Sequence, residues 1–173
     1  GVLLQRLAKY ESITDRVEME IGRFLTRTGA EVREEQVSAR IRGMLAIISN
    51  LERTGGLLFQ LGKSLERKFD DRLWFSPGQR QDLLDMIALL DRAFLIMLGN
   101  LEAEEEEFSV DEAMLVEHHI NRHRDQLHRA QLKNMGSGEQ DRRADMVYAD
   151  VFNSLEAIGD RLLDVSEALA GKW

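Results

Sequence analysis

The stretch WFSPGQRQDLLDMIALL (residues 74–90) contains the only proline of the chain and its clearest helix start. Ser76 is a favoured N-cap residue, Pro77 suits the first helical position, and Gln79 completes a capping box. The apolar repeat that follows predicts a helix over about 77–107. Because a chain of 173 residues with one proline contains almost nothing that forbids helix, the sequence predicts an all-α fold.

Similar patterns predict four further helices, which gives about five long helices in all. Two precede the proline, over about 2–28 and 31–69, and Gly55-Gly56 is expected to loosen or kink the second. Ser109 and Ser137 are expected to cap the last two, which reach about 135 and 171. The predicted apolar seam of the first helix consists of Leu3, Leu7, Tyr10, Val17 and Phe24.

The last three helices can close a three-helix bundle by themselves, whereas the first two cannot. We therefore expect an exposed apolar surface on the first pair, to be covered by a preceding helix or by another surface. A homodimer or swapped helices would bury such a surface. The chain also starts in helical register, which suggests a piece of a longer protein.

Composition excludes several classes of function. The net charge of −8 makes nucleic acid a poor partner, because phosphate binding needs a basic face. Cysteine is absent, which removes disulfides, zinc–thiolate sites and cysteine nucleophiles. Uncharged runs such as 43–51 and 93–101 are far shorter than the ~20 residues of a membrane span. No nucleophile–base motif, phosphate loop or dinucleotide fingerprint is visible, so an enzyme is not expected.

Two short patterns occur twice at nearly the same spacing. LERTGG (51–56) and LEAIGD (155–160) are offset by 104 residues. Glu11-x-x-x-Asp15 and Glu117-x-x-x-Asn121 are offset by 106 residues. The near-constant period predicts two related half-units, residues 1–70 and residues 71–173.

Each of these patterns places two oxygen-bearing side chains on one helix face, inside a mostly apolar flank. Carboxylates there are costly to bury unless something positive meets them. Two explanations stay open. One is a set of salt bridges, and the other is a hard cation such as Mg²⁺, Mn²⁺, Ca²⁺ or ferric iron held between two helices. The candidate partners for salt bridges are Arg16, Arg53, Arg122 and Arg161.

These motifs resemble those of the PhoU family. LEAIGD followed by RLLDVSEAL resembles the PhoU signature, LERTGG followed by LLFQLGKSL resembles its other copy, and YESITDRVEMEIGRFL resembles the helix before it. The wording KYESITDRVEMEI is most similar to the cytoplasmic domain that follows the membrane part of bacterial sodium/phosphate cotransporters. The resemblance implies tandem three-helix bundles, of which the first lacks its leading helix here.

The resemblance also implies a function in phosphate homeostasis. It suggests a non-catalytic regulatory domain at the cytoplasmic side of the inner membrane, with the transmembrane part of its own transporter as partner. A free-standing PhoU-type regulator and a purely structural interaction bundle remain alternatives. A di-metal carboxylate enzyme would need Glu-x-x-His pairs, and Glu117 is followed three residues later by Ile120.

Some PhoU proteins hold metal clusters on these faces, so the resemblance implies a divalent or ferric cation. The implied ligands are Glu117, Asn121, Glu156 and Asp160 in the second half, and Glu11, Asp15 and Glu52 in the first. The first half has Gly56 where the pattern expects Asp, so any ion is expected to prefer the second face.

Two other features have competing interpretations. His119 and His123 are spaced for a transition metal, but His123 also lies on an apolar seam and suits a core histidine with one hydrogen-bond partner. The acidic run 102–107 could bind a basic partner, but it also suits the solvated end of a helix.

Overall fold

The computed structural model describes residues 1–30, 34–103, 110–133 and 138–171, which form five α-helices and no strand. The all-α prediction and the number of long helices are thereby confirmed for the described residues. The helices are α1 (Val2–Ala30), α2 (Glu35–Asp70), α3 (Pro77–Glu102), α4 (Val110–Lys133) and α5 (Glu139–Leu169).

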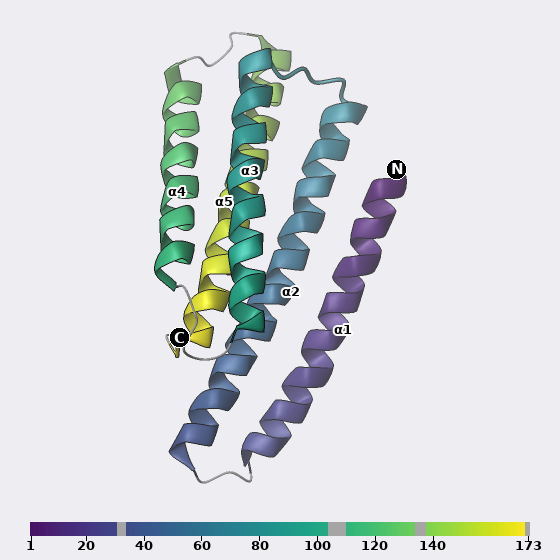
Figure 1. Ribbon diagram of the computed structural model, residues 1–173. Coiled ribbons are helices and arrows are strands. Elements are labelled where there is room, and N and C mark those ends of the chain that lie inside the picture. Colours follow the sequence, from purple (N-terminus) through teal and green to yellow (C-terminus); the bar gives the residue numbers. More distant parts are fainter. Residues whose placement is uncertain (31–33, 104–109, 134–137, 172–173) are drawn as a thin grey trace.

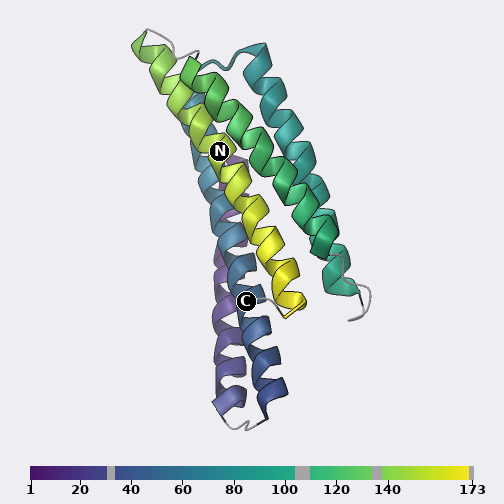
Figure 2. The same cartoon turned by 90° about the vertical axis from the view of Figure 1, so that its left-hand side faces the viewer.

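The helix α5 is the centre of the fold, since it packs against α2, α3 and α4 (Figure 1). The helices α3 and α4 also pack against each other, so the last three helices form the expected bundle. Among the described residues, α1 packs only against α2 and lies at the edge of the molecule (Figures 1 and 2). One element therefore has most of its surface uncovered.

The core follows an apolar seam along α5. Residues that recur every three or four positions along this helix are all buried, as an amphipathic helix requires. They are Val151, Leu155, Ile158, Leu162 and Val165. Phe152 beside them has no exposed surface, and its ring lies edge-on to Tyr148 at a centroid distance of 5.3 Å.

Several predicted boundaries need correction. The helix α3 ends at Glu102, with Ala103 in extended conformation, rather than near residue 107. The run of glutamates that follows explains the early end, because negative charge is unfavourable at a helix C-terminus. The N-cap of α5 is Gly138, without a side-chain hydrogen bond, instead of Ser137. Ser109 and Ser137 themselves lie outside the described residues.

The helix α2 continues without a break through Gly55-Gly56, over Glu35–Asp70. A Cβ at Gly55 would lie 2.8 Å from the Thr14 hydroxyl. A Cβ at Gly62 would lie 2.6 Å from a Leu7 methyl group. Because neither glycine has a side chain, both let α1 approach α2 closely.

The face of α1 that packs on α2 differs from the predicted seam except at Leu7, whose methyl group lies next to Gly62. Leu25 is buried, whereas Leu3, Tyr10, Val17 and Phe24 are exposed. These four residues are spaced by seven positions. Each directly precedes a residue on the side of α1 that faces α2, so its side chain points about 100° away from that side. The expectation of an exposed apolar surface on the first helix pair is confirmed, and these four residues form it on α1.

The predicted capping box at the start of α3 is present. The Gln79 amide N–H donates to the Ser76 hydroxyl at 3.1 Å, and the Ser76 N–H donates to the Gln79 side chain at 2.9 Å. We expect Ser76→Ala to lower the free energy of unfolding by about 1 kcal/mol, because loss of the cap leaves the backbone N–H of Gln79 unsatisfied. Urea denaturation followed by circular dichroism checks this, and an unchanged midpoint contradicts it.

Candidate functional site

The four residues predicted for the second half come together between α4 and α5. Glu117 on α4 is hydrogen-bonded to Asp160 on α5, and the Asn121 amide donates to Glu117. Glu156, one turn before Asp160, accepts a hydrogen bond from Arg124 at 2.9 Å. We call Glu117, Asn121, Glu156 and Asp160 the α4–α5 carboxylate face.

Protons are held unusually tightly on this face. Burial raises the pKa of Glu117, and the charge of Asp160 raises it further. Burial also raises the pKa of Asp160, although the hydrogen bond from Glu117 partly offsets the effect. Burial and Asp160 likewise raise the pKa of Glu156, against the opposing charge of Arg124. A proton or a cation between Glu117 and Asp160 would remove the repulsion.

Sequence reasoning missed Arg124, although it is the cation that meets Glu156. The proposed partners were other arginines, and one of them, Arg161, pairs instead with Asp164 at 2.7 Å. Arg161 also donates to Asn50 of α2 at 3.2 Å. Arg124 lies one turn after Ile120 on α4. Its pairing with Glu156 can be recognised only when the relative position of α4 and α5 is known.

Two polar atoms on or beside this face are buried without a hydrogen-bond partner among the described residues. They are Asn121 Oδ1 and Arg124 Nε. A buried polar atom without a partner costs free energy. The amide oxygen of Asn121 is thus available as an uncharged oxygen ligand for a cation, beside the Glu117 and Asp160 carboxyls.

The first half brings its carboxylates together in part. Asp15 on α1 is hydrogen-bonded to Glu52 on α2, and burial, followed by Asp15 and Glu18, raises the pKa of Glu52. Glu11 is half-buried on α1, where its carbonyl accepts from the Thr14 hydroxyl at 2.8 Å. A Cβ at Gly56 would meet no atom within 4 Å, so the missing aspartate leaves open space.

The two helix pairs make the same close contact at equivalent positions. A Cβ at Gly55 would lie 2.8 Å from the side chain of Thr14, and a Cβ at Gly159 would lie 2.9 Å from that of Ile120. These pairs are related by the offsets of 104 and 106 residues found in the sequence. The internal repeat is therefore visible in packing as well as in sequence.

The placement of these groups does not make a preformed metal cluster. Within the described residues, no group of three or more His, Asp or Glu side chains is arranged to hold a metal ion. Glu117, Asp160 and the Asn121 oxygen supply three donors at most, because Glu156 faces Arg124. Such a donor set suits one weakly held hard cation and is too small for a multinuclear site.

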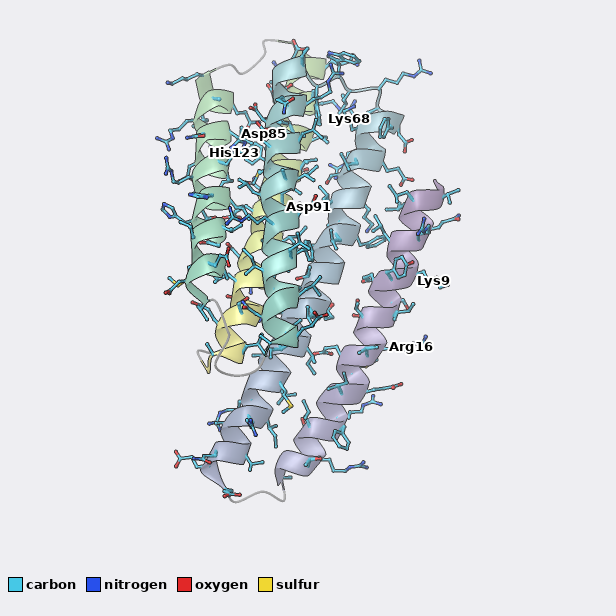
Figure 3. All side chains as sticks on the ribbon, viewed as in Figure 1. Lys9, Arg16, Lys68, Asp85, Asp91 and His123 are labelled. Atoms are coloured by element: carbon cyan, nitrogen blue, oxygen red, sulfur yellow. The ribbon has the colours of Figure 1, made fainter. Side chains whose placement is uncertain are left out.

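His123 is half-buried on α4, and its Nε2 lies 3.1 Å from the carbonyl oxygen of Asp82 on α3 (Figure 3). This placement agrees with the interpretation of His123 as a core histidine with one hydrogen-bond partner. Glu102 ends α3, and the remainder of the acidic run, 103–107, is described only at Ala103.

No protein-family model matches the chain, and no curated protein or solved structure is significantly similar to it. Among the described helices, none is both long and apolar enough to cross a membrane.

The raised pKa values of Glu117 and Asp160 predict a pH-dependent stability. The folded chain holds these protons more tightly than the unfolded chain does. The resulting stabilisation is full below the ordinary carboxyl pKa and is lost as the pH rises through the raised values. Asp160→Asn keeps an oxygen that can accept the hydrogen bond from Glu117 and removes the charge, so it should raise the free energy of unfolding at pH 7 by up to about 1 kcal/mol.

Urea denaturation at about pH 4 and pH 7 measures this effect. The loss of stability between these pH values should be smaller in Asp160→Asn than in the wild type. The matched control is Asp91→Asn, an exposed change on α3 that should leave the pH dependence intact (Figure 3). Equal pH dependence in all three proteins would show that Asp160 is an ordinary solvated residue.

Proposed function

We propose that the chain is a non-catalytic, PhoU-like regulatory domain of a sodium-dependent phosphate transporter, acting on the cytoplasmic side of the membrane. One observation carries the proposal. The two helix pairs that hold the PhoU-like motifs pack through equivalent glycines and each place a carboxyl pair, Asp15–Glu52 and Glu117–Asp160, between their helices. The equivalent glycine packing is what the motif resemblance implies. The two carboxyl pairs occupy different positions of the repeat, because the offsets relate Asp15–Glu52 to Asn121–Glu156.

The carboxyl pairs give the domain a means of responding to its surroundings. Two hydrogen-bonded carboxyls between helices hold a proton, or exchange it for a hard cation that stabilises the same helix contact. A bound cation would supply charge neutralisation and nothing else here. Glu117 and Asp160 would hold it, with the Asn121 oxygen as a neutral third donor. The state of the α4–α5 contact would then report to the membrane part of the transporter.

Deleting the coding segment for residues 1–173 from its own gene tests this function. We expect sodium-dependent uptake of radiolabelled phosphate to persist but to lose its normal dependence on phosphate supply. The variant Asp160→Asn should shift the same dependence, whereas Asp91→Asn should not. Uptake that is indifferent to the deletion would contradict a regulatory function in phosphate transport.

A purely structural interaction bundle is the second candidate, and the ion pair between Arg124 and Glu156 favours it. In such a bundle the carboxylates serve only to pair helices, and metal ions have no effect. Mn²⁺ separates the two functions. A regulatory cation site predicts a higher melting temperature with Mn²⁺, because a ligand that binds only the folded state stabilises it.

We expect the Mn²⁺ effect to depend on the α4–α5 carboxylate face. Asp160→Asn should abolish the rise in melting temperature, because it removes one of two charged donors. Glu52→Gln, in the first half, should retain the rise. Differential scanning calorimetry with and without Mn²⁺ measures both variants. A rise that survives in Asp160→Asn would place the ion elsewhere, and the absence of any rise in the wild type would favour the structural bundle.

A further inference from the structure

We propose that the outer face of α1 docks the domain onto an anionic lipid surface. The inference is independent of phosphate regulation, because it rests on the distribution of charged and apolar side chains along one helix. That helix lies at the edge of the fold and, among the described residues, packs only against α2.

The charges of α1 are segregated across the helix. Leu4, Leu25 and Thr14 mark the side toward α2, through burial or through contact with Gly55 and Gly62. Residues two positions away from such a row lie about 160° around a helix. The basic side chains occupy these opposite positions. They are Arg6, Lys9, Arg16, Arg23 and Arg27, all of them exposed.

The carboxylates of α1 lie mainly on the other side. Asp15 is hydrogen-bonded to Glu52 of α2, and Glu11 and Glu18 are half-buried. Glu20 is the one acidic residue in the outward rows. Lys9 and Arg16 lie on the side of α1 that faces away from α2 (Figure 3). Within the described residues, none of the five basic side chains forms an ion pair with a carboxylate.

An apolar row runs beside the basic rows. Leu3, Tyr10, Val17 and Phe24 are between 48% and 67% exposed, and Ile13 adds to them at 37%. A helix that combines an exposed apolar and aromatic row with Lys and Arg on its polar face is the type that lies in a membrane interface. Self-association through this face is less favourable, because the Lys9, Arg16 and Arg23 rows of two copies would repel each other.

The local charge decides the kind of lipid. The chain as a whole carries −8, so an anionic surface would repel most of it. The outward rows of α1 carry five basic residues against one acidic residue, which reverses the sign locally. Each basic residue near an anionic bilayer strengthens binding about fivefold at physiological salt, an effect that high salt removes. An anionic headgroup layer therefore fits this face, and a zwitterionic one does not.

Co-sedimentation of the purified chain with vesicles tests the proposal. We expect binding to vesicles of mixed phosphatidylglycerol and phosphatidylcholine, much weaker binding to phosphatidylcholine alone, and release at about 1 M salt. The triple variant Lys9→Glu, Arg16→Glu, Arg23→Glu should bind at least about a hundredfold more weakly. The double variant Tyr10→Ser, Phe24→Ser should also weaken binding, through the loss of apolar insertion.

A matched control separates this face from total charge. Arg122→Glu, Arg129→Glu and Lys133→Glu together make the same change in net charge at exposed positions of α4 and should bind like the wild type. Circular dichroism verifies that every variant keeps its helices. Equal binding to both kinds of vesicle, absence of binding, or equal losses in the two triple variants would overturn the proposal. A mass doubled in sedimentation that the α1 variants abolish, without vesicle binding, would instead assign the face to a protein partner.

Discussion

Phe152→Ala is expected to lower the free energy of unfolding by about 3–5 kcal/mol, the largest loss we expect from one side chain. Phe152 lies on α5 with no exposed surface. Its ring contacts Tyr148 at a centroid distance of 5.3 Å and His128 of α4 at 6.2 Å, both edge-on. Alanine would leave a cavity that these rings cannot fill without moving α4 relative to α5.

Equilibrium urea denaturation, followed by the helical circular dichroism signal, measures this loss. The matched control is Phe69→Ala near the end of α2, where the ring is 71% exposed. There the change should stay within about 0.5 kcal/mol, as for most surface substitutions. Similar losses in the two variants would show that the centre of the bundle is not where α5 packs.

The helical fold could be predicted because its signals are local. A single proline with Ser76 and Gln79 around it fixes the start of α3, and the three-to-four-residue spacing of Val151, Leu155 and Ile158 fixes the buried side of α5. The α3 C-terminus was predicted too late, because seam counting ignores the cost of several glutamates at a helix end. The start of α3 and the buried side of α5 could both be predicted without knowing any contact between distant residues.

Which side of α1 packs could not be predicted from hydrophobicity alone. The stronger apolar row, Tyr10, Val17 and Phe24, is exposed, whereas the row with Leu4, Thr14 and Leu25 contacts α2. Close helix approach at Gly55 and Gly62 decides the outcome. This close approach depends on small residues of α2, which the hydrophobic pattern of α1 alone does not reveal.

The candidate site could also be predicted only in part, because some of its contacts depend on how the helices pack. The repeated motifs located Glu117, Asn121, Glu156 and Asp160 and placed them on facing helices. The pairing of Glu156 with Arg124 depends on the relative height of α4 and α5 instead, and sequence spacing within one helix cannot supply that height. The sequence therefore implied four ligands in the second half, whereas Glu156 faces Arg124 and is not a free ligand.

The final prediction concerns the close approach of α4 to α5 at Gly159. A Cβ at Gly159 would lie 2.9 Å from Ile120 Cδ1 and 3.4 Å from its Cγ2, and Ile120 is only 1% exposed. Gly159→Leu must therefore push the two helices apart or force Ile120 out of its rotamer. Overpacking of this kind should lower the free energy of unfolding by about 2–3 kcal/mol, despite the better helix propensity of leucine.

Gly56→Leu is the matched control, since it is the same substitution in a helix where a Cβ meets nothing within 4 Å. There the gain in helix propensity should dominate and raise the free energy of unfolding by about 0.5 kcal/mol. Urea denaturation of both variants gives opposite signs if the close contact controls the result. Because Asp160 follows Gly159 directly, separating the helices should also part Asp160 from Glu117, and the pH dependence of stability should weaken together with the packing. A Gly159→Leu protein as stable as the wild type would mean that α4 and α5 can shift freely, and the carboxyl pair would then not be held by this contact.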